Sequence, residues 1–190
     1  MLEKIPHAVG EALSGLRAGI EKTAYHAEFE GAPAAIRMTS SAFADGAALP
    51  ARFTQDGAKL SPPLAWSGIP AGTAALVLLV EDADSPTPRP IVHAIAWDLP
   101  GTSDGLPEGA LASPGSEGTV EEVGKNTFLR AGYLPPDPPK GHGPHRYLFQ
   151  LYALNRHLGL DGVPGRSALL EGMHGHVLAK GALVGTYERR

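Results

Sequence analysis

Three apolar segments, separated by clusters of glycine and proline, constrain the fold of this chain most. They span residues 74–81, 91–98 and 146–154, lengths typical of β-strands. No long amphipathic helix pattern lies between them, which disfavours strand–helix–strand units and a parallel sheet. The sequence therefore predicts a mainly β, antiparallel, two-layer fold with a few peripheral helices.

Weaker signals complete this prediction. The segment 74–81 is apolar on both faces and is expected to be a central strand. Short strands are predicted at 36–40, 52–54, 118–123 and 182–188. Ser167 is expected to cap a short helix that runs to about His174.

The N-terminal segment has a helical pattern of its own. Apolar residues three or four apart predict one amphipathic helix over 2–20, with the face Leu2, Ile5, Val9, Ala12, Leu13, Leu16 and Ile20. We therefore divide the chain into an N-terminal helix and connection, 1–30, and a main domain, 31–190. The helix either packs on its own domain or docks on a second subunit. Because a free helix would expose this face, we expect a homodimer.

Charge and cysteine content exclude several classes of function. The 190 residues carry a net charge of −4 and no basic stripe, which disfavours nucleic-acid binding. The chain contains no cysteine, so it has neither a disulfide framework nor a thiolate metal site. Charged residues interrupt 1–30, which therefore resembles neither a secretory signal nor a membrane span. A cytoplasmic protein is expected.

Two segments carry polar groups at strand ends or within strands. Asp82 and Asp84 directly follow the central strand, where partial burial would perturb their pKa values. The alternative is a solvated turn in which Asp caps a backbone N–H. His93 lies inside the apolar strand 91–98, where a buried structural histidine is the simpler interpretation.

Residues 141–147, Gly-His-Gly-Pro-His-Arg-Tyr, form the densest cluster of polar rings and charge. Arg146 is expected to bind phosphate or to pair with Asp82 or Asp84. His142 and His145 have neither helical spacing nor a glutamate between them, so we predict no metal. Serine-nucleophile, dinucleotide-binding and phosphate-loop motifs are missing too, and we predict no cofactor.

Several of these motifs, in the same order, resemble the phosphatidylethanolamine-binding proteins, also called Raf-kinase-inhibitor-like proteins, and especially their bacterial branch. The resemblance covers about residues 36–189 and excludes the N-terminal helix. The matching stretches are 60–66 (Leu-Ser-Pro-Pro-Leu-Ala-Trp), 81–86 (Glu-Asp-Ala-Asp-Ser-Pro), 124–126 (Gly-Lys-Asn), 141–147, 176–179 (His-Val-Leu-Ala) and 185–188 (Gly-Thr-Tyr-Glu).

The resemblance implies a β-sandwich-like fold of two antiparallel sheets, with a pocket for phosphate, acetate or a phospholipid head group. Carried over to this sequence, the ligand-binding set is Asp82, Asp84, His93, Pro138, Pro139, His145, Arg146 and Tyr147. Ala83 stands where the family usually has proline, which loosens this turn.

Two functions remain open. The first is binding of a small anion or phospholipid head group without catalysis. Modulation of a partner protein is a further open role of such a binding protein. In this interpretation Asp82 orients the rings of His93 and His145, and Tyr147 adds a donor. The second is a hydrolase or isomerase that uses His93 or His145 as a general base with Asp82.

Overall fold

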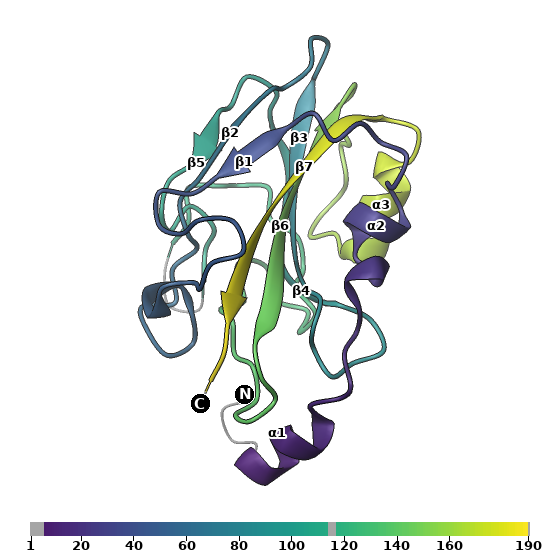
Figure 1. The fold of residues 1–190 in the computed structure, drawn as a ribbon. Coiled ribbons are helices and arrows are strands. Elements are labelled where there is room, and N and C mark those ends of the chain that lie inside the picture. Colours follow the sequence, from purple (N-terminus) through teal and green to yellow (C-terminus); the bar gives the residue numbers. More distant parts are fainter. Residues whose placement is uncertain (1–5, 114–116, 190) are drawn as a thin grey trace.

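Two antiparallel sheets form the body of the molecule. The computed structural model describes residues 6–113 and 117–189, with short helices around the sheets (Figure 1). The larger sheet has the order β4-β3-β6-β7, formed by Ile91–Pro100, Ala75–Asp82, His145–Leu154 and Val177–Tyr187. The smaller has the order β1-β2-β5, formed by Arg37–Thr39, Leu64–Ser67 and Gly105–Leu106. The predicted mainly β, antiparallel fold is confirmed.

Strand β3 is central, as its apolar composition predicts. It pairs with β4 on one side and β6 on the other, and every one of its residues is buried. Leu76, Leu78 and Val80 point into the core between the two sheets. Val77 and Leu79 point to the opposite face, as the two-residue period of a strand requires.

Helices cover that opposite face. Leu169 and Met173 of α3 (Arg166–Met173) are fully buried against it, together with Phe29, which follows α2 (Ala24–Ala27). Burying one such large apolar side chain is worth roughly 1.5–3 kcal/mol. In the described part of the chain, no helix combines the length and apolarity needed to cross a bilayer.

The predicted single helix over 2–20 is wrong. Helix α1 spans only His7–Leu13, an extended segment follows, and a 3-10 helix, η2, spans Ile20–Lys22. Backbone competition explains the break, because the N–H groups of Ala18 and Gly19 donate to Ser85 and Ala83 at 2.8 Å each. Gly19 also adopts a φ of 102°, which ends a helical path. Leu2 and Ile5, part of the predicted apolar face, lie outside the described residues.

Other weak predictions also need correction. Residues 52–54 are not a strand, because η3 (Ala51–Phe53) turns to bury the side chain of Phe53. Residues 118–123 make only one bridge to the large sheet, between Val123 and Ala96. The last strand, β7, starts at Val177 instead of 182, and Gly165 instead of Ser167 is the N-cap of α3. Strands β2 and β5 were not predicted.

Candidate functional site

The end of β3 brings four of the predicted site residues together. The register pairs Asp82 with Tyr147, and alternation along β6 places His145 on the same face. His145 Nδ1 lies 2.8 Å from Asp82 Oδ2, and both side chains are buried. The ring of Tyr147 lies 5.0 Å from that of His93 and 6.4 Å from that of His145, measured between centroids.

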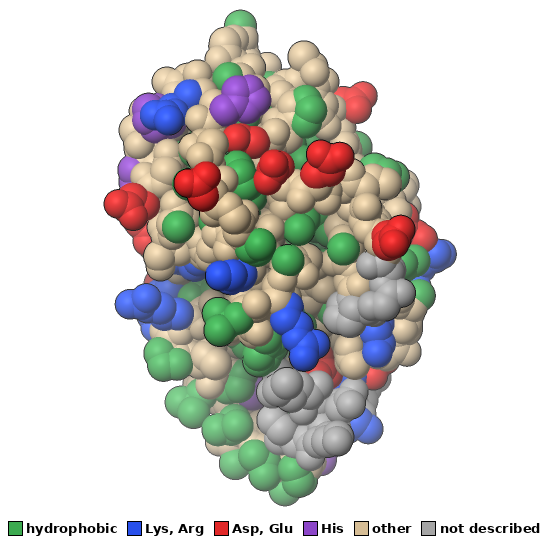
Figure 2. All heavy atoms as spheres, turned by 180° about the vertical axis from the view of Figure 1, so that it is seen from behind, with side chains coloured by type: hydrophobic (Ala, Val, Ile, Leu, Met, Phe, Trp, Pro, Cys, Tyr) green, Lys and Arg blue, Asp and Glu red, His purple; other side chains and the backbone are tan. Residues whose placement is uncertain are grey.

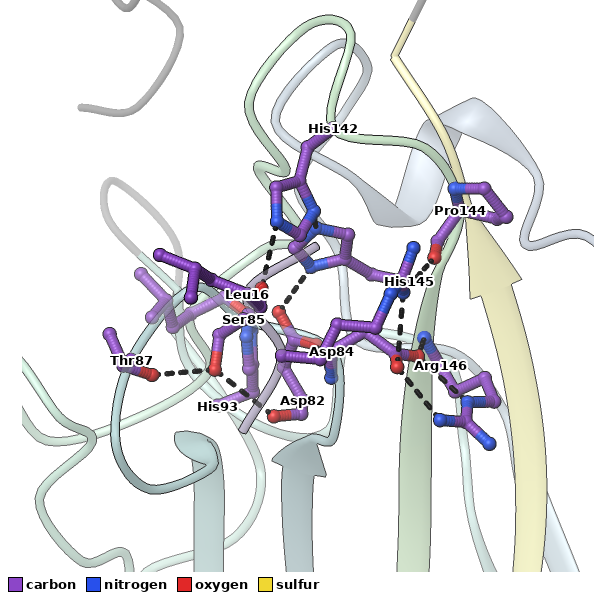
Figure 3. Close-up of polar contacts among 12 residues, drawn as sticks. Leu16, Asp82, Asp84, Ser85, Thr87, His93, His142, Pro144, His145 and Arg146 are labelled. Atoms are coloured by element: carbon purple, nitrogen blue, oxygen red, sulfur yellow. Dashed lines mark hydrogen bonds and ion pairs between the residues drawn. The ribbon is translucent and has the colours of Figure 1, made fainter. Parts of the chain in front are cut away.

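A chain of hydrogen bonds leads from Asp82 away from the sheet. His145 Nε2 lies 2.7 Å from His142 Nδ1, and His142 Nε2 lies 3.1 Å from the carbonyl oxygen of Leu16 (Figure 3). Both ring nitrogens of His145 are therefore within hydrogen-bonding distance of protein groups. In this arrangement His145 does not offer a free N–H to an anion.

Asp84 and Arg146 form a separate ion pair. The strand ends at Asp82, so the two carboxylates do not continue along one face, and Asp84 N donates to Asp82 Oδ1 at 2.9 Å. Arg146 binds Asp84 through both Nε and Nη2, at 2.7 Å each, and Arg17 lies 3.0 Å from Asp84. Burial alone would raise the pKa of Asp84, but the bonds from Arg146 and Arg17 outweigh it and lower the pKa to about 2.

His93 presents a hydrogen-bond acceptor. Its Nδ1 lies 2.7 Å from the carbonyl oxygen of Leu134, so this nitrogen carries the hydrogen and Nε2 is left as a lone pair. Burial lowers the pKa of His93 and outweighs the opposing effect of Asp82, which favours the neutral ring. Within the described residues, His93 Nε2 and the hydroxyl of Tyr147 are buried without a partner. Burial also raises the pKa of Tyr147.

A cavity of about 530 Å³ opens beside these groups. Asp82 and His93 lie on its wall, together with Gln55, Lys59, Ile91, Ser113, Asn126, Phe128, Arg130, Ala131, Tyr133, Leu134, Pro135 and Asp137. The other predicted site residues do not line it in the described part of the chain: Asp84, Pro138, Pro139, His145, Arg146 and Tyr147. The structure thus places two of the eight predicted residues on the cavity wall.

Sequence reasoning missed most of this wall because loops supply it, above all residues 124–134. Residues 124–134 run beside the edge of β4, where Thr127 N donates to Val92 O and Leu134 N donates to His93 O. The stretch mixes polar and apolar residues without a two-residue alternation, so it has no strand pattern. Gly124-Lys125-Asn126, noted above for its resemblance, was the only signal, and Asn126 does line the cavity. The predicted absence of a metal stays a prediction that elemental analysis of untagged protein tests.

Comparison with known proteins places this geometry in a family. The family model "Phosphatidylethanolamine-binding protein" matches residues 39–188. A UPF0098 protein of Pyrococcus horikoshii is 38% identical over 152 residues, which cover 80% of this chain and 76% of the relative.

Two solved structures are similar to this chain. A phosphatidylethanolamine-binding protein homologue from Chlamydia trachomatis has a TM-score of 0.74 at 35% identity, covering 83% of this chain and 99% of the other. Escherichia coli YbcL, described as a member of the mammalian family, also has a TM-score of 0.74, at 27% identity, covering 83% and 100%. The chain therefore belongs to the phosphatidylethanolamine-binding protein family.

Proposed function

We propose that the cavity binds, without catalysis, a small ligand that joins an anionic group such as phosphate to a hydrogen-bond donor. A phospholipid head group with a primary amine has this chemistry. The observation that carries the proposal is that the wall combines buried hydrogen-bond acceptors with cationic side chains. Its buried polar groups include the acceptors Asp82 and His93, whereas Lys59 is half-buried and Arg130 exposed.

The buried acceptors favour a donor on the ligand. Asp82 is 3% and His93 4% exposed, and the lone pair of His93 Nε2 has no partner among the described residues. A buried acceptor left unpaired costs roughly 1–3 kcal/mol, which an ammonium or hydroxyl group would recover. A bare anion placed against Asp82 would instead be repelled.

Two cationic side chains on the wall, Lys59 and Arg130, favour the anionic group of the same ligand. Lys59 and Arg130 belong to separate loops that both border the cavity. On the face in Figure 2, Lys and Arg side chains gather in the half nearer α1, whereas most acidic side chains lie in the other half. Phosphate is bound most strongly by such charge-assisted contacts. The cavity volume also falls within the usual range for small-molecule sites, roughly 300–1,000 Å³.

The hydrogen bonds of the histidines support binding rather than turnover. His145 is bonded at both ring nitrogens, and His93 commits Nδ1 to Leu134. Neither ring is paired with a hydroxyl nucleophile in the bonds it makes. A general base would have to be His93 Nε2, whose burial lowers its pKa and weakens it as a base.

Calorimetric titration with two head groups tests this proposal. Glycerophosphoethanolamine should bind at least about tenfold more tightly than glycerophosphocholine, because the quaternary ammonium has no N–H to donate. Lys59→Ala and Arg130→Ala should each weaken the binding of both ligands by about tenfold or more. Arg156→Ala, which removes the same charge beyond the opposite end of β6, should leave it unchanged.

Equal affinity for both head groups, or loss of binding only in Arg156→Ala, would contradict the proposal. Release of ethanolamine from the ligand during the titration, abolished by His93→Ala, would instead show an enzyme. The cytoplasmic location and any protein partner stay predictions.

A further inference from the structure

The segment 14–19, here called the N-terminal strap, lies outside the region that matches the family and packs on the turn after β3 and the loop before β6. Its backbone bonds to Ala83 and Ser85, and Arg17 donates to the carbonyl of Pro144 at 3.0 Å as well as contacting Asp84. The carbonyl of Leu16 meets His142 Nε2 (Figure 3). Figure 1 shows this stretch passing from α1 along the end of the large sheet.

Counting hydrogens along the chain of bonds shows that the strap demands an extra proton. The carbonyl of Leu16 can only accept, so His142 Nε2 must carry a hydrogen. Asp82 Oδ2, as a carboxylate, can only accept, so His145 Nδ1 must carry one too. Two neutral rings would then face each other with lone pairs at 2.7 Å. Only an additional proton between them turns this contact into a hydrogen bond.

We propose that attachment of the N-terminal strap is coupled to the uptake of one proton by the chain Asp82–His145–His142. The strap fixes the hydrogen on His142 Nε2, which leaves Nδ1 as an acceptor for a charged His145. Because Asp82 also lines the cavity, the strap sets the net charge beside the ligand site. The coupling between strap and proton requires no ligand, and it is therefore tested separately from the proposed function.

The surrounding charges permit one added proton and disfavour two. Burial, the charge on His145 and the nearby Arg17 all lower the pKa of His142, so this ring stays neutral. His93, on β4, has its pKa lowered by burial and does not compete for the proton. Asp84 is neutralised by Arg146 and Arg17. On α1, His7 and Glu11 pair with each other at 3.5 Å.

The direction of the pH effect follows from the proton count. The attached state binds one more proton than the released state, so attachment is strongest below the ordinary histidine range, near ~6.5, and weakens as pH rises above it. The tether between Arg17 and Asp84 persists throughout, because the pKa of Asp84, about 2, lies far below this range. Alkaline pH should therefore loosen the strap without removing it.

Hydrogen exchange at the amides of Ala18 and Gly19 measures attachment, because both amides donate to residues beyond β3. After correction for intrinsic exchange, their protection should fall as pH rises above about 6.5, by at most tenfold per pH unit for one linked proton. His142→Phe keeps the ring but neither nitrogen, and its protection should be lower and independent of pH. Arg17→Gln should lower protection at every pH and keep the wild-type slope. His7→Gln should keep both the protection and the slope of the wild-type protein.

Amides of β3 and β6 serve as an internal reference for folding. If these amides also lose protection in His142→Phe, the variant does not fold. The pH slopes of the wild-type protein and of Arg17→Gln then test the proposal. Protection of Ala18 and Gly19 that is flat with pH in the wild-type protein would overturn the proposal. A wild-type slope retained in folded His142→Phe would overturn it equally, and so would loss of the slope in His7→Gln.

Discussion

At the scale of single residues, three neighbouring carboxylates acquire three different surroundings. Glu81 points to the helix-covered face, where Arg166 Nε binds it at 2.7 Å. Asp82 points to the opposite face and borders the cavity. Asp84 lies past the strand end and pairs with Arg146. The two-residue period of β3 and its termination at Asp82 thus leave one carboxylate of the three on the cavity wall.

The ion pair of Asp84 predicts a loss of stability in acid. Its pKa is about 2 in the folded protein against 3.8 ordinarily, so the pair stabilises the fold above about pH 4, and this contribution disappears as pH falls through about 2. Asp84→Asn should lower the free energy of unfolding at pH 7 by about 2 kcal/mol. The difference from the wild-type protein should shrink toward pH 2.

Urea denaturation at pH 7, 4 and 2 measures this effect. The exposed Asp161→Asn serves as the matched control and should change stability by less than about 0.5 kcal/mol. A deficit for Asp84→Asn that is equal at pH 7 and pH 2 would contradict the assignment.

At this scale, part of the site could be predicted from the sequence. The sequence predicts that Asp82, His93, His145 and Tyr147 line one pocket. The four side chains do lie together, but among the described residues only Asp82 and His93 border the cavity. The sequence does not show which of them reach the cavity, because this depends on the hydrogen bond between His145 and His142. His142 in turn bonds to a carbonyl 126 residues away.

At the scale of elements, a buried polar network attaches α2 to the sheet. Glu81 Oε2 accepts from Ala24 N at 2.7 Å and from Gln150 Nε2 at 2.9 Å, while Gln150 Oε1 accepts from Tyr25 N. The first turn of this short helix is thus satisfied by a sheet carboxylate in place of a local cap. Lys180, from β7, donates to the carbonyls of residues 25, 29 and 30.

Glu81→Gln should therefore destabilise the helix face selectively. The substitution removes the charge opposite Arg166 and sets an amide N–H₂ among donors, which should cost about 2–4 kcal/mol in the free energy of unfolding. Residues 20–30 should lose hydrogen-exchange protection before the strands do. Glu28→Gln, which removes the more exposed partner of Arg166, should cost less than about 1 kcal/mol. Equal losses in the two variants would show that the network does not attach α2.

At this scale, the strands that the sequence predicts correctly are the most deeply buried ones. The three strong apolar segments became β3, β4 and β6, because strands buried on one or both faces leave a clear pattern. Short strands such as β5, with two residues, leave none. The helix over 2–20 failed because its backbone found partners in Ala83 and Ser85, which no local pattern reveals.

At the scale of the whole molecule, the N-terminal segment remains partly uncovered. Gly10 of α1 packs so closely on Lys140 that an added Cβ would lie 1.9 Å from its carbonyl oxygen. Val9 and Leu16 nevertheless stay 44% and 56% exposed. Contact with the chain's own loop thus accounts for one side of the segment, and the homodimer stays a prediction for the other.

Light scattering at micromolar to hundred-micromolar concentration tests the homodimer. We expect the mass of two chains. The double variant Val9→Ser with Leu16→Ser should shift the protein toward one chain, because it removes the large apolar side chains that are exposed among the described residues of this segment. A single-chain mass for the wild-type protein over the whole range would rule out the homodimer and leave packing within the chain.

The most direct test of the central claim is a crystal structure of the protein with glycerophosphoethanolamine. The account predicts the ligand in the cavity, with the ammonium within about 3 Å of Asp82 or His93 Nε2 and the phosphate contacting Lys59 or Arg130. Density for the phosphate at the pair of Asp84 and Arg146, or an ammonium turned away from Asp82 toward solvent, would contradict it.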